Sequence, residues 1–517
     1  MKKFYFTIAT LACFQIGVNA QFSTVLVNEN NIEAEVNNGG VFFNDPTVDS
    51  PGYEYPKGSG KHLIYANTFW FKAEDPSGNP KLSAQLYNLG QDIFPGALST
   101  NGAAAVTPSY DHTKGVYQVT KSEIDYHIAN YWMPGYTVPS SIADWPVHGV
   151  QNIQQDYYLA PFVDVNNDGF YIPSDGDYPL IRGDQATYMI LNDKLDVHGS
   201  GGESMGLECH FMFYQYNSND YRNNTTFLNL KVINRSTQDY PEFKVGCFLD
   251  ADIGNSEDDF AGCDTTQHVM YAYNGTNIDN TYGMNPPAVG VVNLNQPMDV
   301  FGCFKYDHTY MYEPNIPANY FLNLDGRWRD SAPFTVGGNG YGGSVTTNYL
   351  FSGNPNNSGE WSEVQAGLPA GERKMFMASN QGPLMAGEEI CLDYAFIIGD
   401  GGDHLENVNN LIANASDARN FFNTQANFVC ANYEETLKNG AHEISEPAIY
   451  PIPSNGQMTI DFKGEYSLEI HALDGRKVFE QSNMFEKQKI STNLESGSYI
   501  ISILQGGNRI TKPIIVR

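Results

Sequence analysis

Short runs that alternate between apolar and polar residues constrain the fold of this chain most. They are separated by clusters of Asn, Gly, Pro and Asp, which fits strands joined by turns better than helices. Clear examples are FLNLKVINRS at 227–236, FKVGCFLDAD at 243–252 and EEICLDYAFIIG at 388–399. The 33 Tyr, 30 Phe and 49 Gly suit the same kind of structure. We therefore expect a mainly β protein with antiparallel β-sandwich domains and long loops.

One segment departs from this alternation. At residues 404–422 apolar side chains recur at helical spacing, and Asp403 with Glu406 provides a D-x-x-E capping signal at its start. We expect one amphipathic helix near 404–422 whose apolar stripe is a packing face. The stripe consists of Leu405, Val408, Leu411, Ile412, Ala415 and Ala418.

The first twenty residues have the layout of a secretory signal. Two lysines precede an apolar run, and a small-x-small ending at 18–20 predicts cleavage before Gln21. This run is shorter than the roughly 20 residues that cross a bilayer. No other segment is long and apolar enough to span one, so we expect an exported protein with no transmembrane segment.

The formal net charge of −30 is carried by the body of the chain. The last 68 residues hold eight Lys and Arg against seven Asp and Glu, so they are nearly neutral. An acidic body repels nucleic acid and anionic lipid, and we expect neither as a partner. Divalent cations suit so much carboxylate. Solubility outside the cell explains the net charge equally well, though not its local clustering.

Length and composition predict several regions. About 400 residues between signal and tail exceed one ordinary core, so two packed units are expected. The predicted order is a signal peptide at 1–20, an N-terminal β-rich region at 21–215, a second β-sandwich region at 216–430, a polar linker at 431–449 and a small C-terminal β-sandwich at 450–517.

The last of these regions carries an ordered set of short motifs. It opens with YPIPSNG, continues with GRKV, then GSY, and ends on a basic-apolar stretch. Together these pieces closely resemble the type A C-terminal sorting domain of the type IX secretion system, with Ile452 where the usual opening has Asn. The residues that carry the resemblance are Tyr450, Pro451, Pro453, Gly456, Gly475, Arg476, Gly497, Tyr499 and Lys512. The resemblance implies contact with that secretion machinery and delivery to the exterior or outer surface of a gram-negative bacterium.

The body also resembles a known group. Blocks such as NNGGVFFND and DADIGNSEDDFAGCDTTQHVMYAYN are similar to segments of large, uncharacterised proteins that carry such sorting domains. The similarity covers most of residues 37–275. It implies a family without an established activity.

The loop DVNNDGFYIPSDGDYP at 164–179 has the spacing of a calcium-binding motif. Positions 1, 3, 5, 7 and 12 are Asp164, Asn166, Asp168, Phe170 (through its carbonyl) and Asp175. Gly169 permits the sharp turn at position 6. Pro173 and Gly176 stand where an EF-hand helix would begin, so we expect a calcium loop without helices, with Asp177 as a spare ligand. The alternative is a turn whose Asn and Asp side chains bind their own backbone.

A second acidic cluster, LDADIGNSEDDFAGCD, lies at 249–264. Its candidate calcium ligands are Asp250, Asp252, Asp258 and Asp259. So many carboxylates repel one another unless they are solvated, protonated or bridged by a cation, and a solvated acidic turn is the alternative. Asp258 and Asp259 make a poor glycosidase pair because neighbours on a strand point to opposite faces.

Cysteine and serine patterns are less informative. Removal of the signal leaves six cysteines, an even number that favours disulfides in an exported protein. Cys247 and Cys263 bracket the acidic cluster, and a disulfide between them could close it. Free buried thiols are the alternative for one or two of the six. Ser204 lies in a G-x-S-x-G pattern, but a strand is predicted after the serine where a nucleophile elbow needs a helix.

These features favour a non-enzymatic, calcium-stabilised β protein of the cell surface or exterior that serves in adhesion or binds a glycan or other surface ligand. Two alternatives stay open. One is a secreted polysaccharide-active or other hydrolase whose site is assembled from distant residues, and the other is a structural subunit of a surface assembly.

Overall fold

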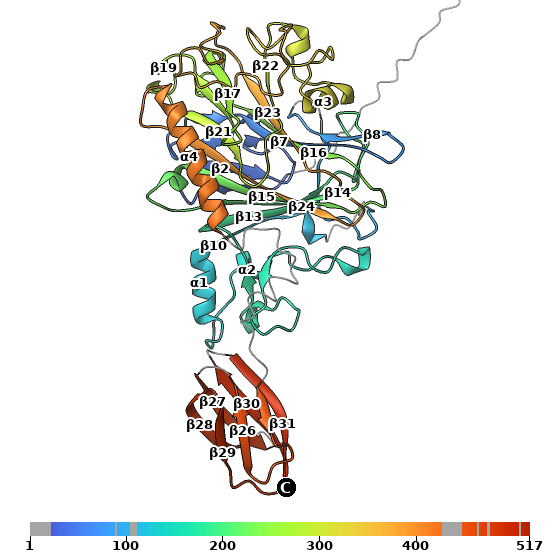
Figure 1. Cartoon of the computed structure of the whole chain (residues 1–517), viewed down its shortest axis with the longest axis vertical. Helices are drawn as coiled ribbons and strands as arrows, with labels where there is room; N and C mark the ends of the chain where they lie inside the picture. Colours follow the sequence, from blue (N-terminus) through green and yellow to red (C-terminus); the bar gives the residue numbers. More distant parts are fainter. Residues whose placement is uncertain are drawn as a thin grey trace, which may run out of the picture. The chain divides into compact units, whose positions relative to one another are not determined.

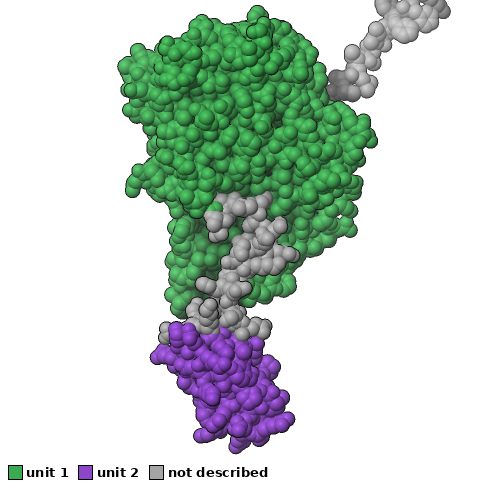
Figure 2. Space-filling view, in the orientation of Figure 1, with its two compact units in different colours: residues 1–433 green, residues 434–517 purple. Residues whose placement is uncertain are grey.

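The computed structural model describes residues 22–87, 90–103, 111–425, 447–462, 465–472, 476–505 and 508–517. Its contacts divide the chain into two compact units, Met1–Tyr433 and Glu434–Arg517 (Figure 2). The expected signal peptide, and the expected linker up to residue 446, lie outside the described residues. The described parts are mainly antiparallel β-structure with long connecting loops, as the alternating sequence pattern predicts.

The central sheet of the first unit has nine strands, labelled in Figure 1. In spatial order they are β10 (Val116–Thr120), β13 (Gln185–Asn192), β14 (Leu207–Gln215), β15 (Thr225–Asn234), β24 (Glu389–Gly399), β21 (Ala288–Asn293), β18 (Val269–Asn274) and β17 (Asp259–Asp264), with β9 (Phe94–Pro95) paired to β13. Phe211 and Phe213 of β14 face one core, whereas Met212 and Tyr214 face another. This sheet is therefore buried on both faces, because successive side chains point to opposite sides.

A second sheet of five strands packs against the first face of the nine-stranded sheet. Its order is β22 (Val300–Phe304), β23 (Lys374–Asn380), β16 (Phe243–Asp250), β7 (Ala66–Glu74) and β8 (Pro80–Ala84). Phe69 of β7 lies 5.8 Å from Phe211 of β14 and 5.3 Å from Tyr394 of β24, measured between ring centroids. These aromatic contacts between the sheets make the sandwich core.

Helices and a small sheet cover the rest of the sandwich. Helix α4 (Glu406–Thr424) packs on β24, β21 and β18, on the outer face of the nine-stranded sheet (Figure 1). Helices α1 (Lys121–Asn130) and α2 (Ser140–Ala143) also contribute to the core on that face. Helix α3 (Pro317–Leu324) covers the five-stranded sheet, where Tyr320 packs edge-to-face on Trp70 at 4.9 Å. A four-stranded sheet of β1 (Thr24–Val27), β2 (Glu33–Asn37), β5 (Tyr53–Glu54) and β6 (His62–Ile64) completes the sandwich core.

The expected division of the body at residue 215 is corrected by this topology. β14 ends at residue 215 and pairs directly with β15, and β7 pairs with β16 across the other sheet. Regions 21–215 and 216–430 thus share both sheets and both of the cores on the two faces of the nine-stranded sheet. The length of the body suggested two packed units, one after the other along the chain. A sandwich with further elements on its outer faces can hold a body of this length in one unit.

The second unit is a small β structure with its own core. One of its sheets contains β25 (Ala448–Tyr450), β26 (Gln457–Asp461) and β29 (Gln488–Ser491), and the other contains β28 (Lys477–Phe485), β27 (Glu465–Ala472), β30 (Gly497–Gln505) and β31 (Asn508–Val516). Eleven buried side chains, from Met458 to Ile514, fill the space they enclose. The small C-terminal β-sandwich expected from the sequence is confirmed as a pair of sheets around one core.

Candidate metal centre

The candidate site lies at one end of the β16–β23 strand pair. Asp250 is the last residue of β16, and Lys374, the first residue of β23, is directly opposite in the antiparallel register. Asp252 lies two residues beyond Asp250, and Glu372 lies two residues before Lys374. Because side chains alternate along a strand, this spacing brings all four to the same face of the sheet.

Three carboxylates meet here. Oxygen atoms of Asp250, Asp252 and Glu372 lie within 4.8 Å of one another. Asp250 is only 2% exposed, and neither its Oδ1 atom nor the Oδ1 atom of Asp252 has a hydrogen-bond partner. A buried polar atom without a partner is costly, so these oxygens point to a missing proton or cation.

The other oxygen of Asp250 is held by neighbouring side chains. Its Oδ2 accepts a hydrogen bond from the Tyr87 hydroxyl at 2.7 Å and lies 3.3 Å from the Lys374 ammonium. Lys374 also lies 3.1 Å from Glu313 and donates to the Tyr87 hydroxyl at 2.6 Å. Glu372 lies 4.0 Å from the same ammonium, and the charge of Lys374 also acts on Asp252. Four carboxyl groups therefore lie around one ammonium.

This excess of carboxylates is reflected in their acidity. Burial, followed by the charge of Asp250, raises the pKa of Asp252 to about 7. Burial, together with the charges of Asp250 and Asp252, raises the pKa of Glu372 to about 8. Burial also raises the pKa of Asp250, although Lys374 opposes this shift. Full ionisation of the cluster is thus unfavourable, and a bound proton or cation would stabilise it.

The geometry of the cluster suits a hard divalent cation. Calcium takes carboxylate oxygens at about 2.3–2.6 Å, so oxygens within 4.8 Å of one another can all contact one such ion. Asp250, Asp252 and Glu372 would supply three of its six to eight ligands. Among the described residues, no second group of His, Cys, Asp and Glu side chains has three ligand atoms this close together.

Sequence reasoning identified two of these three carboxylates. It singled out Asp250 and Asp252 but not Glu372, which follows them by more than a hundred residues. Only the register of β23 against β16 brings Glu372 to the site. A one-residue shift in that register would turn Glu372 to the opposite face.

The other two predicted ligands of the acidic cluster lie apart from this group. The Asp258 Oδ1 accepts a hydrogen bond from the Asn255 side chain at 3.0 Å, and the Asp259 Oδ2 accepts one from the backbone N–H of Ile253 at 3.1 Å. Asp259 is fully buried, and its Oδ1 has no partner. Burial, opposed by the backbone bond but reinforced by the charge of Asp252, leaves the pKa of Asp259 well above its ordinary value.

The loop at 164–179 is folded around its own acidic side chains. Asp164 accepts hydrogen bonds from the backbone N–H groups of Asp168 at 3.3 Å and Gly169 at 2.7 Å. Asn166 Oδ1 accepts from the same Asp168 N–H, and Asp168 Oδ1 accepts from the N–H of Phe170. Gly169 has φ +82°, the conformation expected at the sharp turn. These bonds match the polar-turn alternative, and each oxygen keeps a second lone pair for a cation.

The remaining acidic residues of this loop have different environments. Asp175 is exposed and lies in a short 3-10 helix at Pro173–Asp175. Asp177 is fully buried, and its two oxygens accept from the backbone N–H groups of Val165 and Ile172. The loop connects β11 (Phe162–Val163) to β12 (Tyr178–Pro179), so it joins two β segments as predicted. Calcium binding here stays a prediction.

The predicted disulfide between Cys247 and Cys263 is wrong. Both are buried free thiols. Cys247 lies in β16 of the five-stranded sheet, and Cys263 lies in β17 at an edge of the nine-stranded sheet. The Cys263 thiol donates to the Leu350 carbonyl at 3.6 Å, and Cys247 Sγ accepts from the Asn67 side chain. Two cysteines can bracket a loop in sequence and still lie in different sheets.

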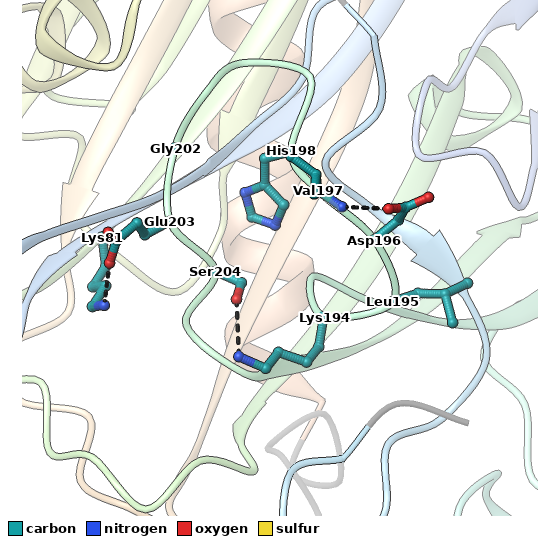
Figure 3. A pocket seen from close by; sticks show the side chains of 9 residues that line it. All are labelled: Lys81, Lys194, Leu195, Asp196, Val197, His198, Gly202, Glu203 and Ser204. Carbon is teal, nitrogen blue, oxygen red and sulfur yellow. Dashed lines mark hydrogen bonds and ion pairs between the residues drawn. The ribbon is translucent and has the colours of Figure 1, made fainter. Parts of the chain in front are cut away.

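A surface pocket surrounds Ser204, and the histidine that lines it is not placed to act as a general base (Figure 3). The Lys194 ammonium donates to the Ser204 hydroxyl at 3.1 Å, and Lys81 pairs with Glu203 at 2.6 Å. Both ring nitrogens of His198 lie against backbone carbonyl oxygens, at 2.9 and 2.7 Å. The histidine therefore has no nitrogen free to take the serine proton. β14 follows Ser204, as the sequence predicts.

The sorting-motif residues lie in the second unit. Tyr450 ends β25, Gly497 and Tyr499 lie in β30, and Lys512 lies in β31. Gly456 has φ +90°, and a side chain there would lie 2.6 Å from the Thr492 carbonyl, so the turn requires glycine. Pro451, Pro453 and Arg476 are also described, whereas Gly475 lies outside the described residues.

Comparison with known proteins defines the class of this second unit. Residues 448–517 match the family model of the secretion system C-terminal sorting domain. The chain therefore carries a type IX secretion sorting domain, and this domain marks it as a secreted or cell-surface protein. Among the described residues, no helix is long and apolar enough to cross a membrane.

The chain is similar to several solved structures, at low sequence identity and low TM-score. A polysaccharide lyase is 8% identical with a TM-score of 0.17, and a copper-containing benzylamine oxidase from Hansenula polymorpha is 7% identical with a TM-score of 0.29. These matches cover 60% and 73% of this chain, and 34% and 60% of the two other chains. A putative aldose 1-epimerase from Escherichia coli is 9% identical over 74% of this chain and 100% of its own, with a TM-score of 0.23. No curated protein matches the chain in sequence.

Proposed function

We propose that this protein is a calcium-stabilised β protein of the cell exterior that serves in adhesion or ligand binding rather than in catalysis. One observation carries the proposal. Asp250, buried and with an unpartnered Oδ1, belongs to a group of three carboxylates close enough to hold one cation. Lys374 alone does not balance the three carboxyl groups that it contacts, Asp250, Glu313 and Glu372, and Asp252 adds a fourth beside them.

A bound divalent ion would stabilise the native state only. The ligands come from the ends of two strands that are far apart in sequence, so the unfolded chain lacks the site. A ligand that binds only the native state at 100 times its Kd adds about 2.7 kcal/mol to the free energy of unfolding. Calcium suits the site better than magnesium, because magnesium demands near-ideal octahedral geometry and gives up its waters reluctantly.

Calorimetric titration of CaCl₂ into chelator-treated protein tests the proposal. We expect saturable binding and a higher thermal midpoint with calcium than with EDTA. Asp252→Asn should abolish binding at the strand-pair site, whereas Asp168→Asn should remove only binding at the loop of residues 164–179. Asp196→Asn is the matched control, because Asp196 is an exposed aspartate distant in sequence from both.

The two variants separate the two candidate sites. Loss of one binding event in each variant supports calcium at both, and loss in Asp252→Asn alone limits calcium to the strand-pair site. The proposal fails if calcium neither binds nor shifts the midpoint, or if Asp252→Asn binds calcium as the wild type does.

A further inference from the structure

The tyrosines beside the strand-pair cluster form two pairs. The ring centroids of Tyr65 and Tyr87 are 5.1 Å apart, and those of Tyr306 and Tyr312 are 5.3 Å apart. The Lys374 ammonium connects them, at 5.2 Å from the Tyr87 ring and 6.0 Å from the Tyr306 ring. One ring of each pair thus lies beside the ammonium group that contacts the carboxylates.

This arrangement is accessible from solvent. Tyr306 is 48% exposed, and the side chain of Glu372 is 20% exposed, although Asp250 is buried. The Tyr306 hydroxyl donates to Glu313 at 2.7 Å, so the ring is fixed in place at the rim of the cluster. Glu372 of the cluster and the Tyr306 side chain beside it are therefore both accessible to a ligand from solvent.

A cation at this site would keep open coordination positions. The chain brings three carboxylate ligands together, whereas calcium takes six to eight oxygens. Water or ligand hydroxyl groups must fill the rest. Two neighbouring hydroxyls of a sugar can replace two waters, and the apolar C–H face of a sugar ring can pack on tyrosine.

We propose that the strand-pair cluster and Tyr306 form a glycan-binding site, in which the vicinal hydroxyls of a neutral pyranoside bind the metal ion and its ring stacks on Tyr306. The inference rests on the proposed cation site and names the ligand class that this site takes. A neutral sugar fits better than an acidic one, because the four surrounding carboxyl groups oppose a second anion.

Saturation-transfer NMR on the full chain tests this inference with three probes: methyl α-D-mannopyranoside, methyl α-D-glucopyranoside and methyl β-D-galactopyranoside. We expect transfer to at least one probe in CaCl₂ and none in EDTA. Tyr306→Ala should weaken that binding about tenfold, the scale of one aromatic contact, while calcium binding by calorimetry stays unchanged. Tyr306→Phe keeps the ring and should keep the binding.

Trp132→Ala provides the matched control, because Trp132 is a 66% exposed aromatic residue next to α1. It should leave sugar binding intact. Calcium binding without transfer to any of the three probes overturns the glycan inference and leaves the proposed function standing. Sugar binding that persists in EDTA, or that Tyr306→Ala does not change, also overturns it. Absence of calcium binding removes the proposed function and this inference together.

Discussion

Glu208 and Asp250 show two ways of burying a carboxylate in this sandwich. Glu208 is fully buried, yet both of its oxygens have partners: Oε1 accepts from Arg235 at 2.8 Å and lies 2.9 Å from the His210 ring, and Oε2 accepts from the Leu98 N–H. Asp250 is as well buried but leaves Oδ1 without a partner. Protein groups pair both oxygens of Glu208, whereas Asp250 needs a proton or a cation to pair its Oδ1 atom.

Because both Glu208 oxygens have partners, we expect the free energy of unfolding to fall in acid. Burial opposes ionisation, but the bonds to His210 and Arg235 lower the pKa of Glu208 from 4.5 to about 2. Because this pKa is depressed in the folded state, its contribution is present above pH 4.5 and is lost as the pH falls toward 2. Glu208→Gln should lower the free energy of unfolding at pH 7 by about 3 kcal/mol, since it leaves Arg235 without its buried partner.

Denaturant unfolding at pH 7 and pH 3 measures both parts of this prediction. The difference between wild type and Glu208→Gln should shrink at pH 3, because Glu208 of the unfolded wild type is protonated there and folding must release that proton. Glu74→Gln, at an exposed position, should be within about 0.5 kcal/mol of wild type at both pH values. An equal Glu208→Gln effect at the two pH values would contradict the role given to this charge.

Helix α4 could be predicted from its local sequence, but the complete cation site could not. The Asp403 carboxylate accepts from the backbone N–H groups of Leu405 and Glu406, and Glu406 reaches back to the Asp403 N–H. This is the capping box that the D-x-x-E pattern predicts. The strands at 227–236, 243–252 and 388–399 are likewise confirmed as β15, β16 and β24 within about two residues.

The features that could not be predicted from the sequence depend on how strands far apart in the sequence pair and align. Alternation identifies β16 and its acidic end, but it does not say which strand pairs with it or how that strand is aligned. Glu372 belongs to the site only because Lys374 is opposite Asp250. The disulfide prediction failed for the same reason, since nearness in sequence placed Cys247 and Cys263 together and the sheets separated them.

Packing of α4 on the sheet gives a prediction for this element. Leu411 is fully buried and lies over Gly290 of β21 and Gly399 of β24, where the missing side chains let the helix approach the sheet closely. Leu411→Ala should cost about 2–5 kcal/mol in unfolding free energy, because the cavity cannot be filled from either glycine. Asn420→Ala, on the exposed face of the same helix, is the control in urea unfolding. Equal midpoints for the two variants would contradict this packing.

For the whole molecule, the two units differ in charge as well as in core. The acidic residues are concentrated in the body, and the last 68 residues are nearly neutral. Among the described residues, the buried core of the second unit consists of side chains from that unit, and the strand-pair cluster lies in the first unit. The sorting domain and the proposed cation site therefore lie in different units, each with its own core.

Separate cores predict separate unfolding transitions in scanning calorimetry of the full chain. Calcium should raise the midpoint of the larger transition, which belongs to the body, because the ion binds only its native state. The smaller transition should stay at the same temperature, since residues 448–517 contribute no ligand to the cluster. Deletion of Glu434–Arg517 should remove the smaller transition and leave the calcium shift of the larger one unchanged. A single transition, or a calcium shift that is lost with the deletion, would mean that the two units are energetically coupled and that the cluster depends on the sorting domain.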